Sequence, residues 1–94
     1  MDRAEFEAGL RRDGYAEIVE RRMEPNTDNP EHAHEFDARL MVIEGEMAIA
    51  RNGAVETYRA GETFSVESGC RHAERGGSEG AVYLAGRRYS KPAA

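Results

Sequence analysis

Short apolar stretches separated by turn-forming residues run through most of this chain. From Tyr15 onward, apolar and polar residues alternate in short runs, which is the pattern of half-buried strands. Asn52-Gly53 is the strongest hairpin signal. Many short strands at spacings of about ten residues predict an all-β barrel or sandwich. The predicted strands cover residues 15–23, 33–44, 46–51, 55–59, 63–67, 71–75 and 81–86.

Two segments depart from the strand pattern. Asp2 and Glu5 form a capping-box pattern, and Phe6 with Leu10 gives apolar residues four positions apart. We therefore expect a short amphipathic helix over residues 3–12, packed against the barrel. Residues 24–31 have the composition of a loop and are predicted to be one.

The alternation also predicts which side chains face inward. His32 and His34 are in phase with Leu40 and Val42, so all four are expected in the barrel interior. Met41, like Ile43, would then lie on the outer face. Either the N-terminal helix covers that face or the chain forms a homodimer through it, and the sequence leaves both explanations open.

Length and composition limit the classes of protein that this chain can represent. Its 94 residues suit a single domain, 1–94, with a core over about 15–89, and the tail 91–94 is expected to be frayed. The net charge is −5, and no basic run suggests nucleic-acid binding. No apolar stretch is long enough for a membrane span, and no signal peptide is recognisable. With a single cysteine, Cys70, we expect a soluble cytoplasmic protein without an internal disulfide.

The three histidines are the candidate chemistry. His32 and His34 form an H-x-H pair, whose side chains would share one side of a strand. If the fold brings His72 beside them, three neutral imidazoles converge, as in a metal site that keeps one position open. A barrel can also carry histidines as packing residues or as a relict site.

Taken with the glycines around them, these histidines resemble the cupin family, whose fold is a small double-stranded β-helix, or jelly-roll-like, barrel. Its first motif, an H-x-H pair followed by a glutamate and a glycine, is matched by His32, His34 and Gly45. The histidine of its second motif is matched by His72, at the expected intervals after two further glycines. Those are Gly61 and Gly69.

The departures from the motifs bear on the chemistry. The family's glutamate ligand falls at Ala38, and Glu35 and Asp37 are out of phase with His34 on a regular strand. The chain therefore resembles three-histidine cupins, among which are thiol dioxygenases. The resemblance implies a divalent transition metal on His32, His34 and His72, with Fe, Zn, Ni, Mn and Cu not distinguished. Because a neutral ligand set leaves the metal's charge uncompensated, anionic ligands such as carboxylates, enolates and thiolates are favoured.

Other polar residues are weaker candidates. For Cys70 a small buried hydrophobic role is favoured over that of an outer metal ligand, and Asp37 with Arg39 suggests a structural ion pair. Glu74 shares the face of His72 and is a weak candidate acid or base, although a solvated strand glutamate is the favoured interpretation. Three tyrosines fit strand propensity without a recognisable proton-donor role: Tyr58, Tyr83 and Tyr89.

Three functions remain open on the sequence. The first is a metal-dependent enzyme, such as an oxygenase, isomerase, decarboxylase or hydrolase, although the sequence does not identify a catalytic acid or base. The second is a non-catalytic sensor that binds a small ligand, and the third is a structural barrel with a relict metal site. The expected partners are a small anionic molecule and a second copy of the chain, without nucleic acid or membrane.

Overall fold

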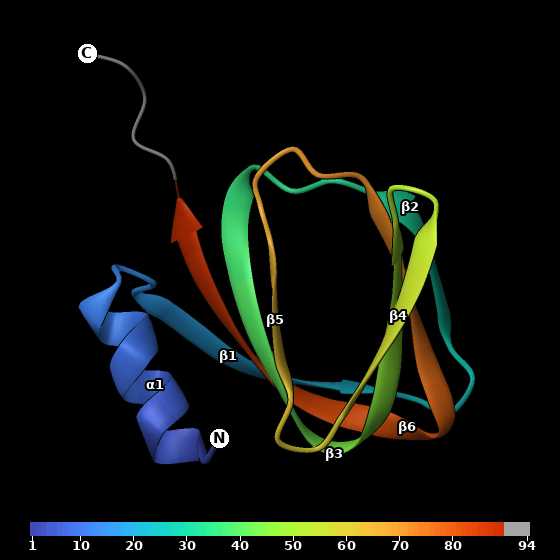
Figure 1. Ribbon diagram of the computed structural model, residues 1–94, viewed down its shortest axis with the longest axis horizontal. Helices are drawn as coiled ribbons and strands as arrows, with labels where there is room; N and C mark the ends of the chain where they lie inside the picture. Colours follow the sequence, from blue (N-terminus) through green and yellow to red (C-terminus); the bar gives the residue numbers. More distant parts are fainter. Residues whose placement is uncertain (90–94) are drawn as a thin grey trace.

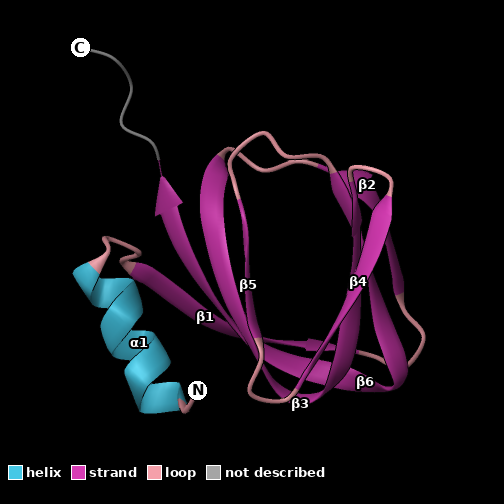
Figure 2. Ribbon diagram, viewed as in Figure 1, coloured by secondary structure: helices cyan, strands magenta, loops and turns pink. Residues whose placement is uncertain are grey.

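The computed structural model describes residues 1–89 as one helix and six strands (Figures 1 and 2). The tail 91–94, which was expected to be frayed, lies outside the described residues. No helix within the described residues is both long and apolar enough to cross a membrane. The elements are α1 (Arg3–Arg12), β1 (Glu17–Met23), β2 (Asp28–His32), β3 (Phe36–Arg51), β4 (Ala54–Arg59), β5 (Thr63–Val66) and β6 (His72–Tyr89).

All strand pairings are antiparallel, and they are organised around the two longest strands. The order is β1-β6-β3-β4, with β2 also pairing with β6 and β5 also pairing with β3. The β3–β6 register shifts between Val42 and Glu44 and again between Gly45 and Met47. Such irregularities bend a strand, and both long strands curve around the barrel in Figure 1. The fold is the predicted all-β double-stranded β-helix with a short N-terminal helix.

Local signals predicted the ends of several elements well. The helix has the predicted bounds, and the Asp2 carboxylate caps it by accepting a hydrogen bond from the Glu5 amide. Asn52 and Gly53 join β3 to β4 with φ angles of 51° and 76°. Positive φ at both positions is what a tight hairpin turn requires.

Other boundaries were predicted wrongly. The segments 33–44 and 46–51 are joined into β3, and 71–75 and 81–86 are joined into β6, because bulges let a strand continue through a bend. The second half of the predicted loop 24–31 belongs to strand β2, which pairs with β6 through Asn29 and Glu74. Its loop-like composition is overridden by hydrogen bonding to a strand distant in sequence.

The barrel interior holds the larger of two apolar clusters. Leu40 and Val42 both lie in it, as the alternation predicted. The remaining buried members come from β1, β3, β5 and β6: Met23, Ala38, Met47, Ile49, Phe64, Val66, Ala81 and Ala85.

The second cluster lies between the helix and the outer face of the sheet. Phe6 and Leu10 of α1 pack there against Met41 of β3 and Leu84 of β6. Met41 is only 3% exposed, so the helix covers the face for which a homodimer was the other explanation. An exposed apolar face is therefore no longer a reason to expect a homodimer, and the homodimer stays a prediction.

Gly45 allows the bend in β3, and its replacement tests that role. Gly45→Ala is expected to destabilise the fold by more than about 1–3 kcal/mol, because φ is +73° and the new Cβ would overlap the backbone carbonyl of Gly80. Gly53→Ala is the control, since its φ is +76° but its Cβ would meet open space. Urea unfolding of both variants measures the difference, and equal losses would show that the close approach at Gly80 contributes nothing.

Candidate metal site

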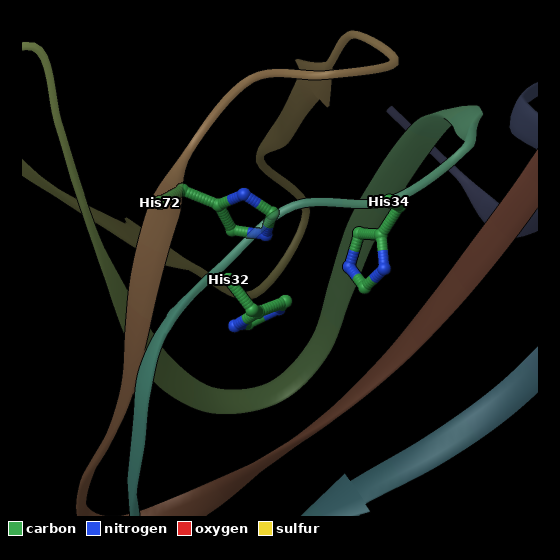
Figure 3. Close-up of side chains that lie close together, drawn as sticks. All are labelled: His32, His34 and His72. Carbon is green, nitrogen blue, oxygen red and sulfur yellow. The ribbon is translucent and has the colours of Figure 1, made fainter.

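The three histidines come from neighbouring parts of the barrel and meet at one place. His32 is the last residue of β2, His72 is the first of β6, and the two are paired across these strands. Each of the three rings, including that of His34, offers a nitrogen within 4.8 Å of the nitrogens of the others. The labelled rings lie around one shared space in Figure 3.

The expected placement of the H-x-H pair on one strand is wrong in detail. Strand β2 ends at His32, and His34 lies in the short non-strand segment before β3 begins at Phe36. The two rings still lie together, with their centroids 4.7 Å apart. Proximity therefore comes from the irregular segment after β2 rather than from strand alternation.

Backbone carbonyls orient two of the rings. His32 Nδ1 lies 2.7 Å from the carbonyl oxygen of Pro30, and His72 Nδ1 lies 2.9 Å from that of Cys70. Because a carbonyl only accepts hydrogen bonds, both Nδ1 atoms must donate. In the neutral rings the lone pair is then on Nε2, which is the arrangement that metal-binding histidines show.

The third ring is held by packing. His34 stacks on Phe36, with centroids 4.6 Å apart and planes 17° from parallel. Burial is the main cause that lowers the pKa of His34, and positive charge on His32 or His72 lowers it further. The low pKa favours the neutral imidazole, which is the form that binds metals.

A pocket of about 470 Å³ opens beside the histidines. Ala38 and Leu40 form part of its apolar wall, while Arg21, Arg87 and Tyr83 add polar groups. Burial raises the pKa of Tyr83, so its hydroxyl stays protonated at neutral pH. This volume is in the range of small-molecule sites. Ala38 thus places a methyl group where the family motif carries a carboxylate.

Neither nearby acidic residue replaces that carboxylate. The Asp37 carboxylate accepts hydrogen bonds from the Ser68 amide at 2.9 Å and from Arg88 at 3.0 Å, and these contacts lower the pKa of Asp37. Arg39 pairs with Asp13 at 2.7 Å, so the predicted Asp37–Arg39 ion pair is wrong. Asp37 and Glu35 are both absent from the described pocket lining.

The interpretation of Glu74 as a solvated strand residue is also wrong. Its side chain is 12% exposed and lines the pocket. Cys70 packs against the interior cluster, which agrees with a hydrophobic role, although its side chain is partly buried and not fully buried as was expected. Sequence reasoning missed Arg21 and Arg87, because strand pairing places them at the pocket and the sequence carries no motif for that pairing.

Fold and site together define a small antiparallel β barrel with a histidine-lined pocket. The sequence profile of the family described as "Cupin domain" matches residues 19–85, most of the chain. The chain therefore belongs to the cupin family. None of the curated proteins matches its sequence closely.

Solved structures support the same fold. A protein of unknown function from Rhizobium leguminosarum is 22% identical with a TM-score of 0.73, over 78% of this chain and 69% of that one. A cupin-2 domain protein from Shewanella frigidimarina is 24% identical with a TM-score of 0.65, over 76% and 69%. A variant oxalate decarboxylase from Bacillus subtilis is 19% identical with a TM-score of 0.69, over 77% of this chain but 20% of that one. At these identities the likeness concerns the fold alone.

Proposed function

We propose that this cupin binds one divalent transition metal through His32, His34 and His72 and uses it to hold a small anionic molecule. The observation that carries the proposal is the convergence of three imidazole nitrogens, within 4.8 Å of one another, on the wall of the pocket. Three histidines with further positions open is the arrangement of ligand-accepting metal sites. Zinc, iron, nickel and copper all suit imidazole, so the donor set leaves the metal open.

The charge of the pocket favours an anion as the bound molecule. Three neutral rings do not compensate a dication, which when bound would attract a carboxylate, enolate or thiolate. Arg21 and Arg87 add positive charge to the pocket lining. Arg87 already pairs with Glu17 at 3.4 Å, whereas Arg21 forms no ion pair with another residue of the described range. Of the two arginines, Arg21 is therefore the one whose charge is free to pair with a ligand carboxylate.

A cobalt titration tests the metal site. The wild-type chain is expected to bind one equivalent of Co²⁺ with visible absorption bands, and His34→Ala is expected to bind it about 100-fold more weakly, since one ligand is worth a few kcal/mol. Elemental analysis of freshly purified, untagged protein identifies the metal acquired in the cell. If neither Co²⁺, Zn²⁺ nor Fe²⁺ binds to the wild type, the site is a relict one.

The anion is tested on the cobalt-loaded protein. Malonate is expected to shift the Co²⁺ bands, and Arg21→Gln is expected to weaken malonate binding about tenfold, the effect of losing one charge-assisted hydrogen bond. Arg22→Gln is the matched control, because Arg22 is the next residue of β1 and lies outside this pocket. Equal malonate affinity in both variants would exclude Arg21 from anion binding.

A further inference from the structure

Glu74 brings a carboxylate to the three histidines from an unexpected strand. It lies two residues after His72 on β6, so both side chains face the pocket. Its Oε2 is 3.7 Å from His72 Nε2, and its Oε1 is 3.8 Å from His32 Nε2. The two carboxylate oxygens thus approach the two nitrogens that are candidates for metal binding.

The neighbouring strand holds this carboxylate in place. Asn29 of β2 is the cross-strand partner of Glu74, and its side-chain amide donates a hydrogen bond to Oε1 at 3.1 Å. Within residues 1–89 this is the one hydrogen bond that the carboxylate receives. A carboxylate that is only 12% exposed therefore has few hydrogen-bond donors around it within the described residues.

The Nε2 lone pairs of His32 and His72 point toward the Glu74 carboxylate. Because Nδ1 of His32 and of His72 each donates to a carbonyl, the Nε2 atom of each neutral ring presents a lone pair. Both lone pairs meet an anionic carboxylate, and groups that only accept hydrogen bonds repel one another. A positive charge placed among them would turn this repulsion into attraction.

We propose that Glu74 is a ligand of the same metal and takes the role of the glutamate that the family motif would place at position 38. This inference rests on the proposed function, because it requires the histidines to bind a metal. Ligand atoms of a tetrahedral site lie about 3.4 Å apart for bonds of about 2.1 Å. The separations of 3.7 and 3.8 Å approach that value without any rearrangement of strands.

A glutamate ligand at position 74 instead of position 38 affects both the charge of the metal site and the side on which the site is open. With Glu74 bound, the net charge of a divalent centre is +1, which still attracts a monoanion. The carboxylate comes from β6, so the pocket wall at Ala38 of β3 remains available to the exogenous molecule.

Glu74→Gln tests the assignment, because it keeps the shape and removes the charge. We expect a loss of Co²⁺ affinity of about 100-fold, at the upper limit of what residues outside the coordination sphere produce, together with a changed Co²⁺ absorption spectrum. Glu31→Gln is the matched control. It removes the same charge from the same pocket lining, where Glu31 pairs with Arg71 at 2.7 Å, and it should leave both affinity and spectrum unchanged.

Two further variants separate ligation from folding. Glu74→Asp keeps the carboxylate and is expected to bind Co²⁺ more tightly than Glu74→Gln. Adding Ala38→Glu to Glu74→Gln offers a carboxylate from the family position and is expected to restore part of the affinity. If the wild type binds one equivalent of Co²⁺ and Glu74→Gln matches it in affinity and spectrum, Glu74 is not a ligand. If the wild type binds no metal, the proposed function itself fails.

Discussion

Zinc is expected to stabilise this protein strongly, and His72→Ala is expected to remove most of that stabilisation. A ligand that binds only the folded state adds about 4 kcal/mol to the free energy of unfolding at 1,000 times its dissociation constant. For a domain of this length that corresponds to a rise in Tm of about 15 °C or more. His72 is the most buried of the three histidines, at 1% exposed. In the variant, a water molecule would therefore have the least access to the metal position that the His72 ring leaves empty. Calorimetry of the metal-free and zinc-loaded forms measures both effects.

Magnesium supplies the control for this experiment. Mg²⁺ prefers oxygen ligands and should leave the Tm of the wild type unchanged at the same concentration. The metal-free His72→Ala variant should itself be less stable, because the ring is fully buried and its Nδ1 donates to the Cys70 carbonyl. A full zinc-induced shift in His72→Ala would contradict the three-histidine site.

The features that the sequence predicted well are those fixed by neighbouring residues. The N-cap at Asp2 and the turn at Asn52-Gly53 depend on side chains and φ angles within a few positions. The alternation that placed Leu40 and Val42 inside needs only one buried face. Strand β2 was missed because Asn29 and Pro30 give it a loop-like composition, and its stability comes from pairing with β6.

The same distinction applies to the candidate site: residues that belong to a local motif were predicted, and residues placed by distant strand pairing were not. His32, His34 and His72 were found because their spacing to glycines forms a motif, and the structure places their nitrogens together. Glu74 was noticed as a residue facing the same side as His72, but the Asn29 that pairs with it and donates to its carboxylate belongs to a strand that was not predicted. Arg21 reaches the pocket wall through the β1–β6 pairing, which no local pattern in the sequence specifies.

The second large effect concerns the helix. Leu10→Ala is expected to lower the free energy of unfolding by about 3–5 kcal/mol, because it removes a fully buried side chain and leaves a cavity. Leu10 packs closely on β6, where a Cβ at Gly86 would meet its Cδ2 at 2.6 Å. For a small domain this is a large part of the total stability. Urea unfolding measures the loss.

Because Leu10 packs against the outer face of the sheet, this loss should leave the metal site intact. Its cluster includes Met41 and Leu84, whereas Leu40 and Ala85, their neighbours in sequence, face the interior and line the pocket. Under conditions where Leu10→Ala is still folded, we therefore expect its Co²⁺ affinity to match that of the wild type. Val55→Ala, at a side chain that is 70% exposed, is the control and should change neither quantity. A parallel loss of Co²⁺ affinity in Leu10→Ala would show that the helix supports the histidines through the sheet.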